Sequence, residues 1–541
     1  MDAITAPPEP RNEPVRNYAP HTAERACLEA RLKELAAERP ELTMSIGGRH
    51  RMGSGTPIDV VAPHRHATVL ATMGQATRDD VAAAIGAAEQ AAPEWQALSF
   101  DDRAAVFLRA ADLLAGPWRD TLNAATMLGQ SKSCYQAEID AACELIDFWR
   151  CNVAFARRIL ADQPYSPPTT WNRMDHRPLD GFVLAITPFN FTSIAGNLPT
   201  APAIMGNTVV WKPSPTQQLA AHYTMRLLEA AGLPAGVINV VTGEGPPVSE
   251  GAITHPNLAG IHFTGSTRVF QLLWRTVGER LASYRGYPRL VGETGGKDFV
   301  LAHPSADPDT LASGLVRGAF EYQGQKCSAA SRAYLPRSLW EAGLGERLAA
   351  ETRAVTYGDV TDFANFGGAV IDRRAFDKLV GVLEMARTDP AVTVLAGGTA
   401  DDSEGFFVQP SLLACDDPGH DVFRTEYFGP ILSVFVYPDA RFDEAVDHVR
   451  ESPYALTGAI FAQDRPAIAA ATQALRFAAG NFYINDKPTG AVVGQQPFGG
   501  SRASGTNDKA GSMLNLLRWT SPRSIKENFV PATDIRHPHQ G

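Results

Sequence analysis

Two successive patterns of hydrophobic and polar residues divide the chain. Residues 1–20 are rich in proline and are predicted to form an arm. Beyond this arm, apolar residues recur every three or four positions as far as Arg158, which predicts a run of helices. Ser99 and Asp102 have the spacing of a capping box, which marks a helix start. The clearest helical segments are DDVAAAIGAAEQAAPEW from Asp79, SFDDRAAVFLRAADLLAG from Ser99 and YQAEIDAACELIDFWRCNVAFARRIL from Tyr135.

From Gly181 onward, short apolar strands alternate with helices. The predicted strands are GFVLAI, TVVWK, VINVVTG and GIHFTG, and the predicted helices are Ser193–Met205, Gln217–Ala231 and Pro247–Thr254. This alternation indicates a parallel sheet covered on both faces, which binds ligands at the carboxyl ends of its strands. The motifs that follow the strands should therefore share one rim: Thr187–Asn190, Lys212–Pro215, Thr242–Gly245 and Thr264–Thr267.

A second α/β region runs from Glu293 to about Tyr483 without internal repeats. Near the end of the chain, LLRWTSPRSIKENFV is predicted to form one extended strand, followed by a loose polar tail, Pro531–Gly541. At 541 residues the chain is too long for one compact core, so two or three packed lobes are expected.

Composition and charge narrow the class of protein. With 44% hydrophobic and 20% charged residues, the chain is typical of soluble globular proteins, and its net charge of −10 argues against nucleic-acid binding. Prolines and asparagines interrupt its longest apolar stretch, Gly181–Trp211, so no membrane span is expected. The start has neither an apolar nor an Arg-rich leader, and we expect a cytoplasmic protein.

The six cysteines show no CxxC pairing, which argues against a disulfide framework or a zinc site. Five of them are expected to be small buried residues in a reducing compartment. The sixth, Cys327, lies in EYQGQKCSAASR beside Lys326, a cation that can stabilise a thiolate. On this segment alone, a structural cysteine remains the alternative.

Two further segments carry groups suited to acyl chemistry. In GETGGK, Glu293 precedes a glycine pair that lets the backbone approach a ligand closely, although a solvated turn is the alternative. In TPFNF, the amide of Asn190 stands at a predicted strand end and can donate to an oxyanion, although most loop asparagines cap or turn the chain.

The segment FTGSTRVF follows a predicted strand and opens a helix. Its backbone N–H groups can therefore face an anion such as a phosphate. It is not a GxGxxG motif, and an ordinary helix cap made by Ser266 or Thr267 is the alternative.

Taken together, these segments resemble the aldehyde dehydrogenase superfamily. ETGGK resembles its glutamate signature, GQKCSA its cysteine signature, PFN its oxyanion motif, FTGS its cofactor loop, and EYFGP (Glu426–Pro430) the motif that holds the nicotinamide ribose. All five occur in the family's order. Longer segments, among them RLVGETGGKDF and NDKPTGAVVGQQPFGG, resemble the branch of the family that oxidises glutamate semialdehyde.

The resemblance implies an α/β fold with three parts. These are a parallel-sheet NAD-binding domain, an α/β catalytic domain and a β-flap that joins protomers into at least a dimer. Its expected boundaries are 1–20 for the arm, 21–165 and 182–291 for the NAD-binding domain, 292–505 for the catalytic domain, and 166–181 with 506–541 for the flap and tail.

The resemblance also implies the reaction and its residues. Glutamate semialdehyde, NAD and water would give glutamate and NADH, the second step of proline degradation. A proline dehydrogenase is a candidate partner, and whether it would channel the substrate to this chain is left open by the sequence. Cys327 would be the nucleophile, Asn190 and the Cys327 N–H would hold the oxyanion, and Glu293 would activate water. No metal is implied.

For the cofactor, the resemblance implies the Thr187 backbone, Lys212, Gly265, Ser266, Thr267, Arg268, Val269 and Glu426. Many members carry an acid three residues after this lysine, which disfavours a 2′-phosphate, but here that position is Pro215. For the substrate it implies Ser328, Gly490 and Ala491 around the α-carboxylate and Phe191 and Phe498 along the methylenes. Relatives often have serine where Ala491 stands. Glu144 is a candidate partner for the α-ammonium.

Three other functions remain in competition at this point. An aldehyde dehydrogenase for another short semialdehyde, such as succinate semialdehyde, differs only in the substrate loop. A catalytically silent relative would be expected to lack Cys327, Glu293 or Asn190, and all three are present. A hydrolase using cysteine and histidine is disfavoured because the motifs contain no histidine, and His255 and His262 are expected to be structural.

Overall fold

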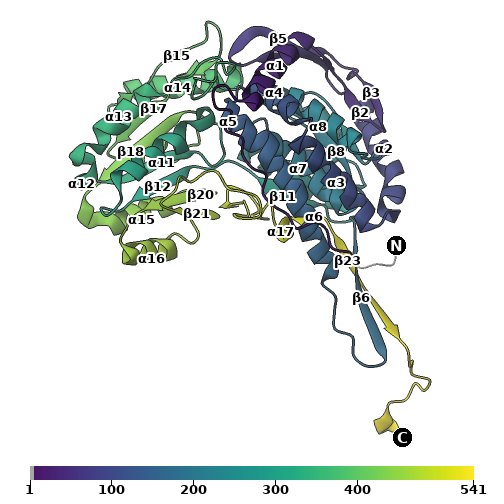
Figure 1. The fold of residues 1–541 in the computed structure, drawn as a ribbon. Coiled ribbons are helices and arrows are strands. Elements are labelled where there is room, and N and C mark those ends of the chain that lie inside the picture. The colour runs from purple at the N-terminus through teal and green to yellow at the C-terminus, as the bar shows by residue number, and fades with distance from the viewer. Residues whose placement is uncertain (1–4) are drawn as a thin grey trace.

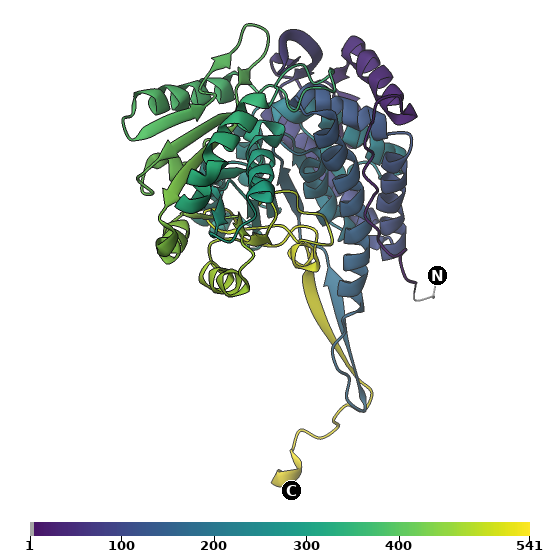
Figure 2. The ribbon, with the colours of Figure 1, turned by 60° about the vertical axis from the view of Figure 1, so that its left-hand side comes forward.

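The computed structural model describes residues 5–541, with the side chains of Pro247 and Ser249 left undescribed. Residues 1–4 of the predicted arm lie outside this range. Two lobes lie side by side, one built from the first half of the chain and the other mainly from the second, and a two-stranded ribbon projects beyond both (Figure 1). The view turned by 60° shows the same projection (Figure 2).

The first lobe is built on a seven-stranded sheet. Its core strands β10, β7, β8 and β9 are parallel, as the alternation of strands and helices predicts. Two short strands that the sequence did not reveal, β2 and β3, extend one edge in antiparallel pairing. In spatial order the strands are β11 (Arg289–Glu293), β10 (Leu258–Thr264), β7 (Phe182–Ile186), β8 (Thr208–Lys212), β9 (Ile238–Val240), β2 (Met44–Ile46) and β3 (Arg49–Arg51).

Helices cover both faces of this sheet because its strands bury side chains on both sides. On β7, Val183 and Ala185 pack on one face, and Phe182 and Leu184 pack on the other. The first face is covered by α3 (Phe100–Ala115), α4 (Arg119–Gln130), α6 (Leu145–Ala161), α7 (Thr192–Ile204) and α8 (Gln218–Ala230). The second is covered by α2 (Arg78–Ala97), α9 (Gly245–Ile253) and α10 (Thr267–Glu279).

The helical region before Arg158 is only partly as predicted. Residues 41–74 form strands, namely β1 (Glu41–Leu42), β2, β3, β4 (Pro57–Ala62) and β5 (Arg65–Gly74), and only α1 (Ala23–Glu38) precedes them. The prediction of a run of helices was wrong for residues 41–74, because these segments pair with one another as strands, which helical periodicity does not report. Cys27, on α1, is exposed rather than buried, whereas Cys134, Cys143, Cys151 and Cys415 are buried as expected.

In the same region, the helix caps and one π-helical segment differ from the prediction. Ser99 caps α3, since its side chain accepts from the Asp102 N–H. In a capping box the Asp102 carboxylate would accept from the Ser99 backbone N–H, but here it accepts from the Ser99 hydroxyl. The reciprocal capping box lies instead at Thr77, which starts α2. The helix predicted from Tyr135 is interrupted: after α5 (Cys134–Ala137), the π-helix η1 (Glu138–Glu144) leads into α6. Such segments often mark functional sites.

The second lobe contains another seven-stranded sheet, mostly parallel. Its strands, in spatial order, are β14 (Val392–Ala396), β17 (Ser411–Cys415), β18 (Ile431–Tyr437), β13 (Ala330–Pro336), β12 (Asp298–Ala302), β20 (Thr457–Phe461) and β21 (Asn481–Ile484). Its flanking helices are α11 (Pro308–Phe320), α13 (Gly345–Ala354), α14 (Arg373–Thr388), α15 (Phe442–Arg450) and α16 (Arg465–Ala474).

The projecting ribbon pairs β6 (Thr170–Arg177) with β23 (Ser521–Asn528) in antiparallel register over eight residue pairs. The single strand predicted for LLRWTSPRSIKENFV was wrong at its start, because its first two residues end the helix α17 (Met513–Leu517). Leu516 and the following Trp519 are buried against the first lobe. The tail Pro531–Gly541 is exposed along its length and ends in a short 3-10 turn, η8 (Pro538–Gln540).

Candidate active site

Cys327 follows a strained turn. The residues Tyr322, Gln323 and Gly324 have φ values of 49°, 53° and 63°, the left-handed region that non-glycine residues rarely adopt. Two buried hydrogen bonds hold this turn, since the Gln323 side-chain amide donates at 2.8 Å to the carbonyls of Ser131 and of Ala369. Strain of this kind persists where surrounding contacts over-determine it, and it places Cys327 just before the amino end of β13.

The electrostatic surroundings of Cys327 differ from the expectation. Burial, together with the carboxyl groups of Asp298 and Glu293, raises the pKa of the Cys327 thiol. Lys326 does not act as its counter-ion, because its Nζ is buried in an ion pair with Glu321 at 3.1 Å. The prediction that Lys326 stabilises the thiolate was therefore wrong, because its charge is paired with the carboxylate of Glu321, which precedes the turn. The thiol needs a base in order to become nucleophilic.

Glu293 ends β11, the edge strand of the first sheet, and is one of the two carboxyl groups that act most strongly on the Cys327 thiol. Burial raises its pKa well above the ordinary value, while Lys509 and the Gly500 N–H oppose the rise. Its Oε2 is buried and has no hydrogen-bond partner among the described residues. A buried carboxyl group with an unused oxygen is suited to accept a proton from water or from a thiol.

The glycine pair after Glu293 permits two close backbone approaches. A Cβ on Gly295 would lie 2.2 Å from a Glu426 carboxylate oxygen, and one on Gly296 would lie 2.7 Å from the Cys327 carbonyl oxygen. The Gly296 N–H also donates to Glu426 at 2.8 Å. The GETGGK, cysteine and EYFGP segments are thus brought together, with glycine required at their junction.

Asn190 lies in the loop between β7 and α7 and is buried. Its side-chain nitrogen donates to the carbonyl of Gln325 at 3.0 Å, two residues before Cys327. An asparagine amide carries two N–H groups, so one remains beyond this bond that can donate to an oxyanion formed at the cysteine. The bond to Gln325 fixes the amide next to the nucleophile's loop.

Most of the residues predicted to bind the cofactor lie along the carboxyl rim of the first sheet, whereas Glu426 precedes β18 in the second lobe. Thr187 follows β7, and its hydroxyl accepts a hydrogen bond from the Trp211 indole at 3.0 Å. Lys212 ends β8, where burial lowers its pKa to about 8 and Glu244, beyond β9, is the nearest opposing charge. Ser266 caps α10 through the Val269 N–H, and the N–H of Gly265 bonds to the Glu293 carbonyl instead of facing the rim. Arg268 and Val269 are exposed.

A cavity of about 380 Å³ opens beside Cys327. Of the predicted substrate residues, Ser328, Gly490, Ala491, Phe191 and Phe498 all line it, and so does Glu144. The Ser328 and Thr489 hydroxyls share a hydrogen bond of 2.8 Å, and Gly490 has a φ of 97°. The sequence therefore selected residues of one cavity, although they come from four separate stretches of the chain.

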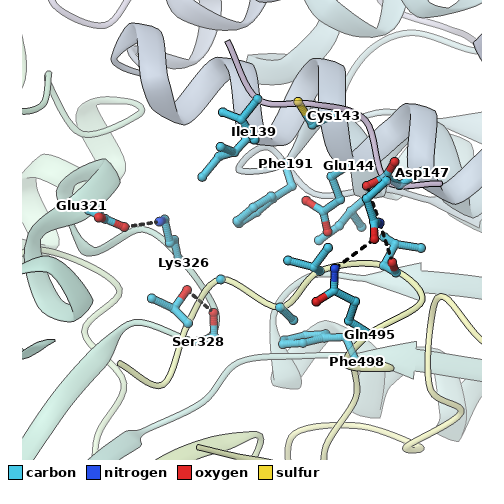
Figure 3. Close-up of a pocket in the computed structure, with 18 of the residues that line it drawn as sticks. Ile139, Cys143, Glu144, Asp147, Phe191, Glu321, Lys326, Ser328, Gln495 and Phe498 are labelled. Atoms are coloured by element: carbon cyan, nitrogen blue, oxygen red, sulfur yellow. Dashed lines mark hydrogen bonds and ion pairs between the residues drawn. The ribbon is translucent and has the colours of Figure 1, made fainter. Parts of the chain in front are cut away.

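The cavity wall is polarised. Lys326, Arg317 and Lys487 lie on one side around Glu321, whereas Glu144 and Asp147 lie on the side formed by η1 and α6. Figure 3 shows Lys326 and Glu321 opposite Glu144 and Asp147, with Phe191 and Phe498 between the two sides. Burial and the neighbouring Asp140 raise the pKa of Glu144 to about 8. Such a cavity suits a ligand that carries both a carboxylate and an ammonium group.

Several residues near the site were missed by sequence reasoning. Lys132 is buried, forms an ion pair with Asp140 at 2.5 Å and lies 4.1 Å from the centre of the Phe191 ring. Asn12, Glu13 and Val15 of the N-terminal arm also line the cavity. A lysine and an aspartate eight residues apart near a predicted helix gave a weak signal, and the arm gave none, because its contacts are all distant in sequence.

A sequence profile described as the aldehyde dehydrogenase family matches residues 50–525. The chain belongs to the aldehyde dehydrogenase family. A curated Schizosaccharomyces pombe protein named probable delta-1-pyrroline-5-carboxylate dehydrogenase is 50% identical to it, over 98% of each chain. A crystal structure described as the delta-pyrroline-5-carboxylate dehydrogenase from Mycobacterium tuberculosis bound with NAD is 64% identical over all of both chains, with a TM-score of 0.97. Proline utilization A from Bdellovibrio bacteriovorus is 28% identical, with a TM-score of 0.92, and the match covers 98% of this chain and 54% of that one.

Family membership confirms the resemblance and the fold class, while the role of each site residue stays a prediction. His262 of this aldehyde dehydrogenase is buried, its Nδ1 is 2.9 Å from the Leu198 carbonyl, and it lies against Trp519, as expected for a structural histidine. Within residues 5–541, no helix is long and apolar enough to cross a membrane.

Proposed function

We propose that this aldehyde dehydrogenase oxidises glutamate semialdehyde to glutamate with NAD, the second step of proline degradation. One observation carries the proposal: Cys327 lines a cavity whose opposite sides offer cations and carboxyl groups, as an amino-acid aldehyde requires. The names of its relatives point to the same substrate, because pyrroline-5-carboxylate is the cyclic form of glutamate semialdehyde.

The chain's own groups account for the chemistry around the carbonyl. The Cys327 thiol gives its proton to a base and its sulfur attacks the aldehyde carbon, forming a thiohemiacetal. The Asn190 amide and the Cys327 N–H donate to the resulting oxyanion. Bound NAD would supply the hydride acceptor, and loss of hydride from this carbon would leave a thioester on the sulfur. Glu293 then removes a proton from water, which attacks the thioester and releases the acid.

The residues along the rim fit a dinucleotide. Lys212 is buried at a strand end with its pKa lowered to about 8, which suits a hydrogen-bond donor to a ribose. Glu426 accepts from Gly296, and a carboxylate has further acceptor capacity for a ribose hydroxyl. Glu244 places a negative charge near Lys212, which opposes a 2′-phosphate and favours NAD over NADP even though Pro215 replaces the usual acid.

Substrate orientation follows from the polarity of the cavity. The α-carboxylate would lie at Ser328 and the backbone N–H groups of Gly490 and Ala491, and the α-ammonium would lie toward Glu144. An approaching ammonium favours the ionised form of a carboxyl group, so Glu144 would release its proton when the substrate binds. Phe191 and Phe498 would enclose the methylenes between these ends.

The test is NADH formation by the purified chain with glutamate semialdehyde and with succinate semialdehyde, each titrated against NAD and NADP. We expect kcat/KM to be highest for glutamate semialdehyde with NAD. The alternative substrate, succinate semialdehyde, has no ammonium group to bind the acidic side of the cavity. A higher kcat/KM for succinate semialdehyde would establish this alternative.

Three further expectations belong to this proposal. The chain would assemble through its ribbon into at least a dimer, act in the cytoplasm, and receive its substrate from a proline dehydrogenase. Light scattering, cell fractionation and co-purification with a proline dehydrogenase would test them in turn.

A further inference from the structure

The N-terminal arm is fastened to the helices beside the cavity by buried carboxylates. The backbone N–H of Glu13 donates to Asp147 at 2.7 Å, and that of Arg16 donates to Glu138 at 2.8 Å. The Tyr18 hydroxyl also donates to Glu138, at 2.9 Å. Figure 3 shows the arm, in the purple of the chain's start, passing alongside Cys143 and Asp147. Residues 13–18 therefore follow a fixed path across η1 and α6.

At the end of this path, Asn12 joins the arm to the loop that bears Gly490 and Ala491. We call residues 489–498 the substrate loop. The Asn12 side-chain nitrogen donates at 2.8 Å to Asp147 and at 2.8 Å to the Val493 carbonyl, and its side-chain oxygen accepts from Gln495 at 2.9 Å. One asparagine amide thus connects the arm to helix α6 and to the substrate loop. Asn12 and Val493 are 481 positions apart in the sequence.

Between its two ends the substrate loop is held mainly by a turn within itself, in which the N–H groups of Gln495 and Gln496 donate to the Val492 carbonyl at 3.0 Å. Near its far end, the Asn481 side chain donates to the Pro497 carbonyl at 3.1 Å. Thr489 bonds to Ser328 at one end, and Phe498 pairs with Ala510 at the other. Between them lie two left-handed glycines, Gly490 and Gly494, which permit several backbone paths. In this middle part, Val493 is buried against Phe148 and Cys151, and Asn12 binds its carbonyl.

We propose that the arm is a latch for the substrate loop, with Asn12 as a positioning residue. By holding Val493 and Gln495, Asn12 sets where the N–H groups of Gly490 and Ala491 point, and hence the affinity for the substrate's α-carboxylate. The inference rests on the proposed function for its substrate. A neutral aldehyde without an α-carboxylate has nothing to gain from these N–H groups, so its oxidation does not depend on the latch.

The decisive variant is Asn12→Ala, compared with Asn17→Ala as a matched control. Asn17 lies on the same arm and is exposed, and within residues 5–541 its side chain bonds locally, accepting from the Ala19 N–H. For Asn12→Ala we expect KM for glutamate semialdehyde to rise roughly five- to twentyfold, as for the loss of one or two hydrogen bonds. KM for NAD and kcat/KM for propanal should stay within twofold of wild type, and Asn17→Ala should match wild type throughout.

Two measurements separate the latch from a general structural role. Amide hydrogen exchange should become faster in residues 489–498 of Asn12→Ala but not elsewhere. Gln495→Ala should reproduce part of the Asn12→Ala effect, because it removes only the bond between these two side chains. The double variant should be no worse than Asn12→Ala, which already removes that bond. Unchanged exchange in this loop, or an equal rise in KM for propanal, would overturn the proposal.

Failure of the proposed function would be seen separately. Wild-type protein that did not oxidise glutamate semialdehyde would refute that function, while loop exchange in Asn12→Ala would still decide whether the arm restrains the loop.

Discussion

Cys327 illustrates how much a single residue depends on its surroundings. Its thiol has a raised pKa in this structure, because burial and neighbouring carboxyl groups both disfavour a thiolate. We expect Cys327→Ala to abolish NADH formation while NAD still binds, since the rim residues do not include the cysteine. Turnover assays and calorimetric titration with NAD would check this, and residual NADH production would refute Cys327 as the nucleophile.

Asn190 has both a structural bond and a proposed catalytic one. For Asn190→Ala we expect kcat to fall roughly 10²–10³-fold, the usual effect of removing one oxyanion donor. Loss of the bond to Gln325 alone should cost only about 0.5–1.5 kcal/mol of stability. Parallel kinetics and thermal unfolding would distinguish these contributions, and a near-normal kcat in a folded variant would remove the oxyanion role.

Glu144 should make stability depend on pH. Its folded pKa of about 8 lies above the ordinary 4.5, so the folded state binds the proton more tightly than the unfolded state does. This contribution to stability is full below about pH 4.5 and is lost as the pH rises toward 8. Relative to Glu144→Gln, the wild type should therefore lose on the order of 4 kcal/mol over this interval.

Denaturant unfolding at pH 5, 7 and 9 would measure the difference between wild type and Glu144→Gln. Glu94→Gln, a change on the exposed surface of α2, provides the control. A constant difference between wild type and Glu144→Gln at all three pH values would contradict the raised pKa.

At the scale of elements, the sequence predicted the four central parallel strands of the first sheet but not its edge strands β11, β2 and β3, and it predicted no individual strands of the second sheet. Strands β7, β8 and β10 alternate with helices, and the rule that ligands bind at carboxyl ends correctly grouped Thr187, Lys212 and Thr264 on one rim. In the second sheet, however, Cys327 and Glu426 precede their strands β13 and β18, so they lie toward the amino ends. Only the resemblance to the family could predict that Cys327 and Glu426 belong to the site, because no local sequence pattern reports how two lobes face each other.

The left-handed turn before Cys327 was equally invisible in the sequence. Nothing in EYQGQ marks Tyr322 and Gln323 as left-handed, since the conformation is imposed by contacts with Ser131 and Ala369, which are distant in the chain. For Gln323→Ala we expect a loss of roughly 2–4 kcal/mol, because two buried carbonyls lose their donor. The kcat should also fall, because the nucleophile's loop is released.

Unfolding in urea and steady-state kinetics would measure these two effects. Gln271→Ala, which removes an exposed glutamine from α10, provides the control and should change neither. A Gln323→Ala protein as stable as wild type would show that the turn does not depend on these bonds.

At the scale of the whole molecule, the stability of the ribbon is the feature that contacts within one chain account for least. Strands β6 and β23 extend beyond both lobes (Figure 2). Among residues 5–541 they pair with each other and with no third strand, and a two-stranded sheet is marginal in water by itself. Trp171 is half exposed on it, and most of β23 is exposed. A second copy of the chain that covered the ribbon would bury this surface and pair its free edges.

Truncation tests this argument directly. Ending the chain after Thr520 removes β23 and leaves β6 unpaired, so we expect the assembly to fall to monomers. Ending it after Val530 removes only the exposed tail and should leave assembly unchanged. Light scattering coupled to size-exclusion chromatography would report the mass, and NAD titration would show that the first lobe remains folded. If the chain lacking β23 kept the mass of the wild type, the subunits would have to associate through the lobes, and the ribbon would need another explanation.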